Sequence, residues 1–215
     1  MSPPDDLYEG FPAGFFARLD PADDRQFYDF DRFVTHIDDG AIAAVGDLYA
    51  ELGVNGRVLD LMSSWVSHFK ATPSALTVLG MNENELAGNP QAAARVVHDL
   101  NADPTLPFPD ASFDDAVCCV SIDYLVRPIE VFREVGRVLV PGGRFICTFS
   151  NRLFPTKAIS GWRFSDDAGH VRIVSEYFRR CAMFDEPVAE QRTPVDHRGD
   201  PLYAVWATRA SVSRW

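Results

Sequence analysis

The stretch Arg57-Val-Leu-Asp-Leu-Met-Ser-Ser-Trp-Val-Ser-His68 decides the fold class of this 215-residue chain. Residues 57–61 form a short apolar run behind the turn residues Asn55-Gly56 and contain an acid, Asp60, which predicts a buried parallel strand. A helix-like segment follows over about residues 64–70. A strand, a tight turn and a helix at the start of an α/β unit are the usual setting for an adenosine-containing ligand. The glycines expected in such a turn are absent here.

Strand and helix patterns alternate over the rest of the chain. Further apolar runs predict strands at 76–81, 95–98, 114–122 and 144–150. Helical patterns are expected at 83–94, with an interruption near 88–90, at 130–140, where Pro141-Gly142-Gly143 ends the helix, and at 165–181. Two strand-like runs at 187–193 and 201–209 predict a hairpin. The expected fold is α/β, a doubly wound, mostly parallel, seven-stranded Rossmann-like sheet that ends in an antiparallel hairpin.

The N-terminal region is unusually aromatic. Residues 1–54 are expected to form a cap with helices, and residues 55–215 one α/β unit. Seven aromatic side chains between residues 11 and 33 must be buried against something, which favours a lid over the ligand cleft for residues 11–36. Residues 42–52 have helical spacing and end at Gly53, and this helix fits the cleft or the flank of the sheet equally well.

Composition narrows the class of protein. The apolar fraction is 47%, the charged fraction is 24%, and the net charge of −11 disfavours a nucleic-acid partner. No apolar run reaches the roughly 20 residues of a membrane span, and the first residues lack the features of a signal peptide, so we expect a cytoplasmic protein without a membrane partner. The four cysteines and five histidines show no metal-ligand spacing, which predicts reduced thiols and no metal site. A monomer and a homodimer are both compatible with the sequence.

A family resemblance emerges from three consecutive stretches, the middle one being Asp115-Ala-Val-Cys-Cys-Val-Ser-Ile-Asp-Tyr-Leu-Val-Arg-Pro128. Phe108-Pro-Asp-Ala-Ser-Phe-Asp114 leads into the strand at 114–122, and Glu130-Val-Phe-Arg-Glu-Val-Gly-Arg-Val-Leu-Val-Pro-Gly-Gly143 leads into the next strand. In order and spacing these resemble the class I SAM-dependent methyltransferases, in particular the type 11-like subgroup that methylates small molecules. The resemblance covers roughly residues 55–150 and implies S-adenosyl-L-methionine (SAM) as cofactor and a small-molecule substrate.

The resemblance also assigns site residues. Asp60 matches the acid that closes the first strand, and Asn82 stands where the family usually has an acid that binds both ribose hydroxyls. Asp99, Leu100 and Asn101 lie where the family holds the adenine. Ser121, Asp123 and Tyr124 follow the fourth strand, beside the place of methyl transfer in the family.

The glycine motif is the main departure from the family. Met62, Ser64 and Val66 occupy positions of family glycines, where the backbone must take positive φ and approach the cofactor closely. Three hypotheses remain open. In the first, a reshaped loop binds SAM, and Ser63, Ser64 and Ser67 donate hydrogen bonds to its carboxylate. In the second, the chain is a catalytically silent methyltransferase-fold protein that acts as a binding or scaffolding module. In the third, the site binds a different small ligand. Ser63 and Ser64 could equally be ordinary helix N-caps. For Trp65, a place in the core or in the cleft wall is favoured over a contact with the sulfonium of SAM.

Methyl transfer requires alignment of the acceptor and, for a hydroxyl or amine, a base. The candidate catalytic residues are Asp123, Tyr124 and His36, although a surface role suits His36 as well. Candidate substrate-binding residues follow the fifth strand and would favour an anionic acceptor: Asn151, Arg152 and Lys157. Loop capping and solvated charge explain these three equally well.

Overall fold

The computed structural model describes residues 7–211 and contains one seven-stranded sheet. The strand order is β3-β2-β1-β4-β5-β7-β6. The strand bounds are β1 Arg57–Leu61, β2 Ala75–Gly80, β3 Ala94–Val97, β4 Phe113–Cys119, β5 Leu139–Phe149, β6 Val188–Gln191 and β7 Tyr203–Thr208. The first five strands pair in parallel, whereas β7 runs antiparallel to both β5 and β6. The predicted fold class is confirmed, including the terminal hairpin.

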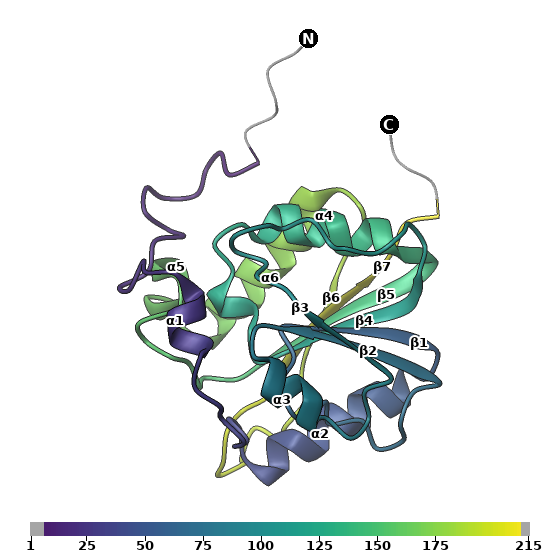
Figure 1. The fold of residues 1–215 in the computed structure, drawn as a ribbon. Helices are drawn as coiled ribbons and strands as arrows, with labels where there is room; N and C mark the ends of the chain where they lie inside the picture. Colours follow the sequence, from purple (N-terminus) through teal and green to yellow (C-terminus); the bar gives the residue numbers. More distant parts are fainter. Residues whose placement is uncertain (1–6, 212–215) are drawn as a thin grey trace.

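Helices cover both faces of this sheet (Figure 1). Helices α4 (Pro128–Val138) and α6 (Asp167–Cys181) lie on one face, and α2 (Asp39–Glu51) lies on the other. Successive side chains of β1 point to opposite faces of the sheet. Leu59 and Leu61 therefore pack with α4 and α6, and Val58 packs with α2. Within residues 7–211, no helix combines the length and apolar content that a membrane span requires.

The helix expected at residues 64–70 is wrong, because residues 62–74 connect β1 to β2 without helix or strand. Met62 and His68 have φ of 52° and 57°, in the left-handed region that interrupts a right-handed helix. The side chains between them are held by distant partners. Trp65 Nε1 donates to the Val34 carbonyl at 3.1 Å, and Asn89 Nδ2 donates to Ser67 Oγ at 2.8 Å. Tertiary contacts therefore replace the helix of a regular βαβ unit.

Two other boundaries differ from the expectation. Strand β4 ends at Cys119, and Val120, at a φ of 45°, turns the chain into the 3₁₀ helix η1 (Ile122–Tyr124). Helix α4 ends at Val138, so Pro141 lies inside β5 rather than at the helix end. Helix α3 (Glu83–Gly88) stops before Asn89-Pro90, near the predicted interruption.

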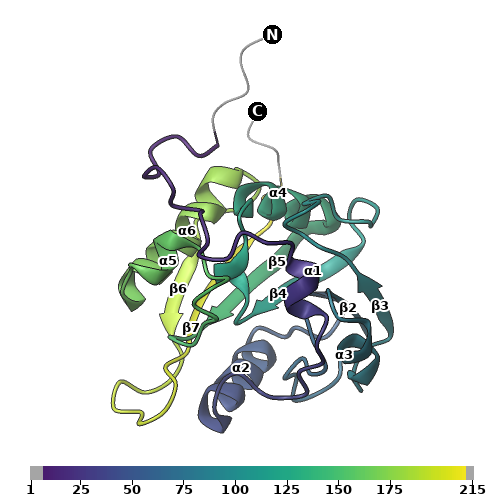
Figure 2. The same cartoon turned by 60° about the vertical axis from the view of Figure 1, so that its left-hand side comes forward.

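The N-terminal cap (residues 11–36) runs across the molecule from the neighbourhood of α5 (Ser160–Arg163) to the strand ends near α3 (Figure 2). It contains one short helix, α1 (Asp24–Tyr28). Backbone hydrogen bonds fix its first part: Gly161 donates to the Phe15 carbonyl at 2.8 Å, and Asp20 donates to the Thr156 carbonyl at 2.9 Å. Beyond α1 the cap is less buried, and Phe30 is 72% exposed.

Candidate functional site

A cavity of about 230 Å³ lies beyond the carboxyl ends of β1 to β4. In open α/β sheets this edge is where ligands bind. The loops after these strands form its floor, and the cap contributes Asp24, Tyr28, Arg32 and His36 to its walls. The cap therefore closes a cleft that the sheet creates.

The loop after β1 brings Met62, Ser63 and Ser64 to this cavity. Met62 adopts the positive φ for which the family uses glycine, and a flexible side chain without β-branching tolerates it. Ser63 Oγ donates to Asp60 at 2.7 Å, below the cavity floor. Burial raises the pKa of Asp60 to about 7, so this predicted cofactor residue is largely protonated below neutral pH. Asp60 borders a smaller adjoining pocket, which Trp65 and His36 also line.

Asn82 lines the cavity, and neighbouring groups hold its side-chain amide. Its Oδ1 accepts the Glu85 N–H at 2.9 Å and so caps α3. Both amide hydrogens serve the cap, because Nδ2 donates to the Tyr28 carbonyl and to Asp31 Oδ1, each at 3.0 Å. The residue at the position of the family's ribose-binding acid therefore tethers the cap.

Asp99, Leu100 and Asn101 also line the cavity, as the sequence predicted. Asp99 Oδ1 accepts the N–H groups of Asn101 and Ala102, and its Oδ2 has no partner among residues 7–211. Both amide hydrogens of Asn101 are used: its Nδ2 donates to Asp24 at 2.9 Å and to the Tyr124 carbonyl at 3.0 Å, and its Oδ1 accepts the Val126 N–H.

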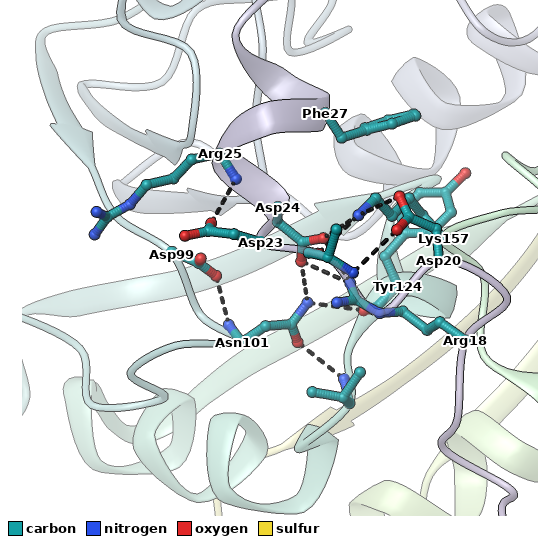
Figure 3. Close-up of polar contacts among 12 residues, drawn as sticks. Arg18, Asp20, Asp23, Asp24, Arg25, Phe27, Asp99, Asn101, Tyr124 and Lys157 are labelled. Atoms are coloured by element: carbon teal, nitrogen blue, oxygen red, sulfur yellow. Dashed lines mark hydrogen bonds and ion pairs between the residues drawn. The ribbon is translucent and has the colours of Figure 1, made fainter.

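A buried charge cluster holds the cap over these loops (Figure 3). Asp24, at 5% exposure, accepts hydrogen bonds from Arg18 at 2.7 Å and from Asn101, and it forms an ion pair with Lys157 at 3.0 Å. Lys157 is also paired with Asp20 at 2.9 Å. Burial alone would raise the pKa of Asp24, but the hydrogen bonds from Arg18, Asn101 and Lys157 outweigh it and lower that pKa. Asp24 thus stays ionised and anchors the cap.

The predicted catalytic residues lie in different environments. His36 lines both pockets, and its ring meets Phe154 edge to face at 5.2 Å. Loss of water around this ring lowers the pKa of His36, which keeps the imidazole neutral near pH 7.

Tyr124 reaches the cavity, and its hydroxyl accepts the Phe154 N–H at 2.9 Å. Asp123 is 2% exposed and does not line either pocket; burial raises its pKa to about 8. Ser121 lines the cavity and donates to the Cys119 carbonyl at 3.0 Å.

The three predicted substrate-binding residues are not brought together at the cavity. Arg152 lines it, while its Nε donates to Asp200 at 2.6 Å. Asn151 is exposed outside the cavity, and Lys157 is buried in the charge cluster beneath the cap.

Several lining residues had no sequence signal of their own. Tyr28 belongs to the aromatic segment whose burial was expected, but its place in the wall was not predicted, and Phe154 was not singled out at all. Arg32 stacks over the Phe27 ring at 4.6 Å. Glu85 occupies a helix position that polar residues usually expose, yet its side chain lines the cavity. These residues meet only through long-range packing of the cap, which no local pattern encodes.

Comparison with known proteins finds sequences similar to the central part of this chain. Residues 53–147 match a family model described as a methyltransferase domain. The sterol 4-C-methyltransferase strm-1 of Caenorhabditis elegans is 34% identical over 99 residues, which cover 44% of this chain and 28% of that protein. The ubiquinone/menaquinone biosynthesis C-methyltransferase UbiE of Geobacter sulfurreducens is 29% identical over 104 residues, covering 42% and 40% respectively. The matched stretches thus span less than half of either curated relative.

Solved structures share the fold at low sequence identity. The [4+2]-cyclase SpnF superposes with a TM-score of 0.58 at 17% identity, covering 85% of this chain and 89% of that chain. A SAM-dependent methyltransferase from Mesorhizobium loti superposes with a TM-score of 0.53 at 18% identity, covering 78% and 100%. Likeness at this level of identity shows the fold alone.

The donor set of the cavity suits the two ends of SAM. Within residues 7–211, the backbone N–H groups of Ser64 and Trp65 have no acceptor and could hold a carboxylate. The second oxygen of Asp99 could accept an adenine amino group. With the cap docked, the cavity is smaller than the roughly 300–1,000 Å³ of typical small-ligand pockets. SAM therefore fits the residues present, provided that the cap shifts outward.

Proposed function

Because the chain belongs to the class I SAM-dependent methyltransferase superfamily, we propose that it transfers a methyl group from SAM to a small molecule. The observation that carries this proposal is the cavity at the ends of β1 to β4, into which the cap brings an imidazole, His36. A low pKa leaves this imidazole able to accept a proton near neutral pH.

Bound SAM would supply an electrophilic methyl group, and the chain's own residues would prepare the acceptor. Tyr28, Tyr124 and Phe154 form an aromatic wall that excludes water and orients an acceptor of limited size. His36 lies at the junction of both pockets, has no hydrogen-bond partner among the described residues, and could remove the proton of a hydroxyl or amine. Arg152 at the rim would favour an acceptor with an anionic group.

We extend the proposal to the class of substrate, the cellular compartment and the oligomeric state. A net charge of −11 favours a small molecule over a nucleic acid as substrate, and we place the protein in the cytoplasm as a monomer or homodimer.

Calorimetric titration of the purified chain with SAM, and with its demethylated product S-adenosylhomocysteine, tests the proposal. We expect micromolar dissociation constants, followed by methyl transfer in an acceptor screen. Absence of binding up to millimolar concentration, in protein shown by circular dichroism to be folded, would refute it.

A binding or scaffolding module without catalysis is the second candidate. The observation that favours it is that the cap and its neighbours accept every amide hydrogen of the Asn82 and Asn101 side chains. This alternative predicts that the cap stays docked when SAM is added, so hydrogen exchange over residues 17–36 should not change with SAM. Methyl transfer to any acceptor would exclude it.

A further inference from the structure

The cofactor cleft lacks the acid that the family places after β2, because Asn82 stands there. Asn82 is a weak replacement, since both amide hydrogens serve the cap and its neutral oxygen, which already accepts the Glu85 N–H, has one acceptor position left. A ribose diol presents two hydroxyl donors, so a site that orders both needs more than this one position. Another residue of this cleft must supply the rest if an adenosine-containing ligand binds.

Glu85 lies one helical turn beyond Asn82, and its side chain lines the cavity at 7% exposure of the residue. Its two oxygens accept one hydrogen bond each: Oε1 from the Arg32 N–H at 2.7 Å and Oε2 from Ser64 Oγ at 2.5 Å. Among residues 7–211 it forms no ion pair with any Lys, Arg or His. The cavity thus contains a nearly buried carboxyl group that has no ion-pair partner among the described residues.

A carboxylate offers about four acceptor positions, so roughly two remain for a ligand at Glu85. Its neighbours also place it well. Ser64 belongs to the loop after β1, and Arg32 belongs to the cap, so Glu85 lies where loop, helix and cap meet around the cavity. Hydrogen bonds from hydroxyls to a charged acceptor are stronger than those between neutral groups.

We propose that Glu85 is the acceptor for the ribose hydroxyls of the cofactor, in place of the acid missing at Asn82. This inference rests on the proposed function, because it assumes an adenosine-containing cofactor. It assigns the recognition of the sugar to a residue of the first turn of α3 rather than to the end of β2.

The test compares Glu85→Gln with the wild type in calorimetric titrations with two ligands, S-adenosylhomocysteine and its 2′,3′-dideoxy analogue. The wild type should prefer the hydroxylated ligand by about tenfold or more, as expected for hydrogen bonds to a charged group. Glu85→Gln should weaken binding of S-adenosylhomocysteine by a similar factor and leave the dideoxy analogue little affected. Glu83→Gln is the matched control, since Glu83 is exposed in the same turn, and it should behave as the wild type.

The outcomes separate this inference from the proposed function. If the wild type binds neither ligand, both fall. If the wild type prefers the hydroxylated ligand and Glu85→Gln keeps that preference, Glu85 only joins the cap to the loop, and this inference alone is wrong. Should Glu85→Gln fail to fold, Glu85→Asp keeps the charge but retracts the carboxylate by one methylene, and an unchanged preference in that variant would equally overturn the inference.

Discussion

At the residue scale, Asn82 shows that an amide can be required where relatives use an acid. Asn82→Asp removes both donors to the cap and sets a second carboxylate beside Asp31. We expect a loss of about 1–3 kcal/mol in the free energy of unfolding, because the half-buried Tyr28 carbonyl loses its donor and two carboxylates meet. Urea denaturation measures it. Asn84→Asp is the control, since Asn84 also donates to Asp31 but is exposed, and its loss should stay within about 0.5 kcal/mol.

His36 is the other residue whose chemistry can be isolated. His36→Gln keeps a polar side chain but removes the base, so kcat should fall by a factor of about 10² to 10⁴. SAM affinity should stay within about twofold of the wild type, because among residues 7–211 the ring contacts Phe154 and forms no hydrogen bond to the cofactor loops. Single-turnover kinetics with any acceptor found in the screen provide the measurement. Equal loss of binding and turnover would instead make His36 part of the cavity wall.

At the element scale, the cap depends on the buried charges beneath it. Lys157→Met leaves Asp20 without this partner and removes one of the two cations that balance Asp24. Breaking a buried pair costs about 3 kcal/mol or more, so the variant should be destabilised by that amount. Hydrogen exchange should also accelerate over residues 17–36 more than over the sheet.

The matched control for that cluster is Lys70→Met. Lys70 pairs with Asp47 on the surface, and both side chains are about half exposed, so its removal should change stability by less than about 1 kcal/mol. Similar destabilisation by both variants would mean that the cap gains nothing from the buried position of Lys157.

The elements also show what the sequence could predict. Every strand was located within a few residues, because apolar runs between turn residues reflect burial in the sheet. The helix at 64–70 was wrong because Trp65 and Ser67 are held by Val34 and Asn89, contacts between residues 22 to 31 positions apart. Most of the site residues that follow β1 to β4 line the cavity, because this topology brings the carboxyl ends of the strands together, whereas Asp123, Asn151 and Lys157 do not line it. Their partners were not predictable, since the cap that supplies them has no periodic pattern.

At the scale of the whole molecule, two buried carboxyls couple stability to pH. Burial raises the pKa of Asp60 to about 7 and that of Asp123 to about 8, from an ordinary value near 3.8. The folded state therefore binds these protons where the unfolded chain has released them. Their stabilising contribution is complete below about pH 4 and is lost as pH rises through 7 and 8.

The window from pH 6.5 to 8 reports this effect. His36, His68 and His170 have pKa values lowered by burial, so near pH 6.5 the unfolded chain binds more protons at these groups than the folded protein, which opposes the fall by up to about 1 kcal/mol over the window. We expect a net fall of about 1–2 kcal/mol in the free energy of unfolding across this window, since each pH unit per proton is worth about 1.4 kcal/mol. Urea denaturation of the ligand-free protein at several pH values measures it.

Two variants separate the contributions of Asp60 and Asp123 to the pH dependence of the free energy of unfolding. Asp60→Asn should remove the part near pH 7, and Asp123→Asn the part near pH 8, because a neutral amide cannot release the proton. Asp114→Asn is the control: hydrogen bonds from Arg57 lower the pKa of Asp114, so this group is ionised in both states throughout the window. That variant should shift the curve downward without changing its slope. A wild-type curve that is flat or rises from pH 6.5 to 8 would mean that Asp60 and Asp123 are already ionised in the folded protein.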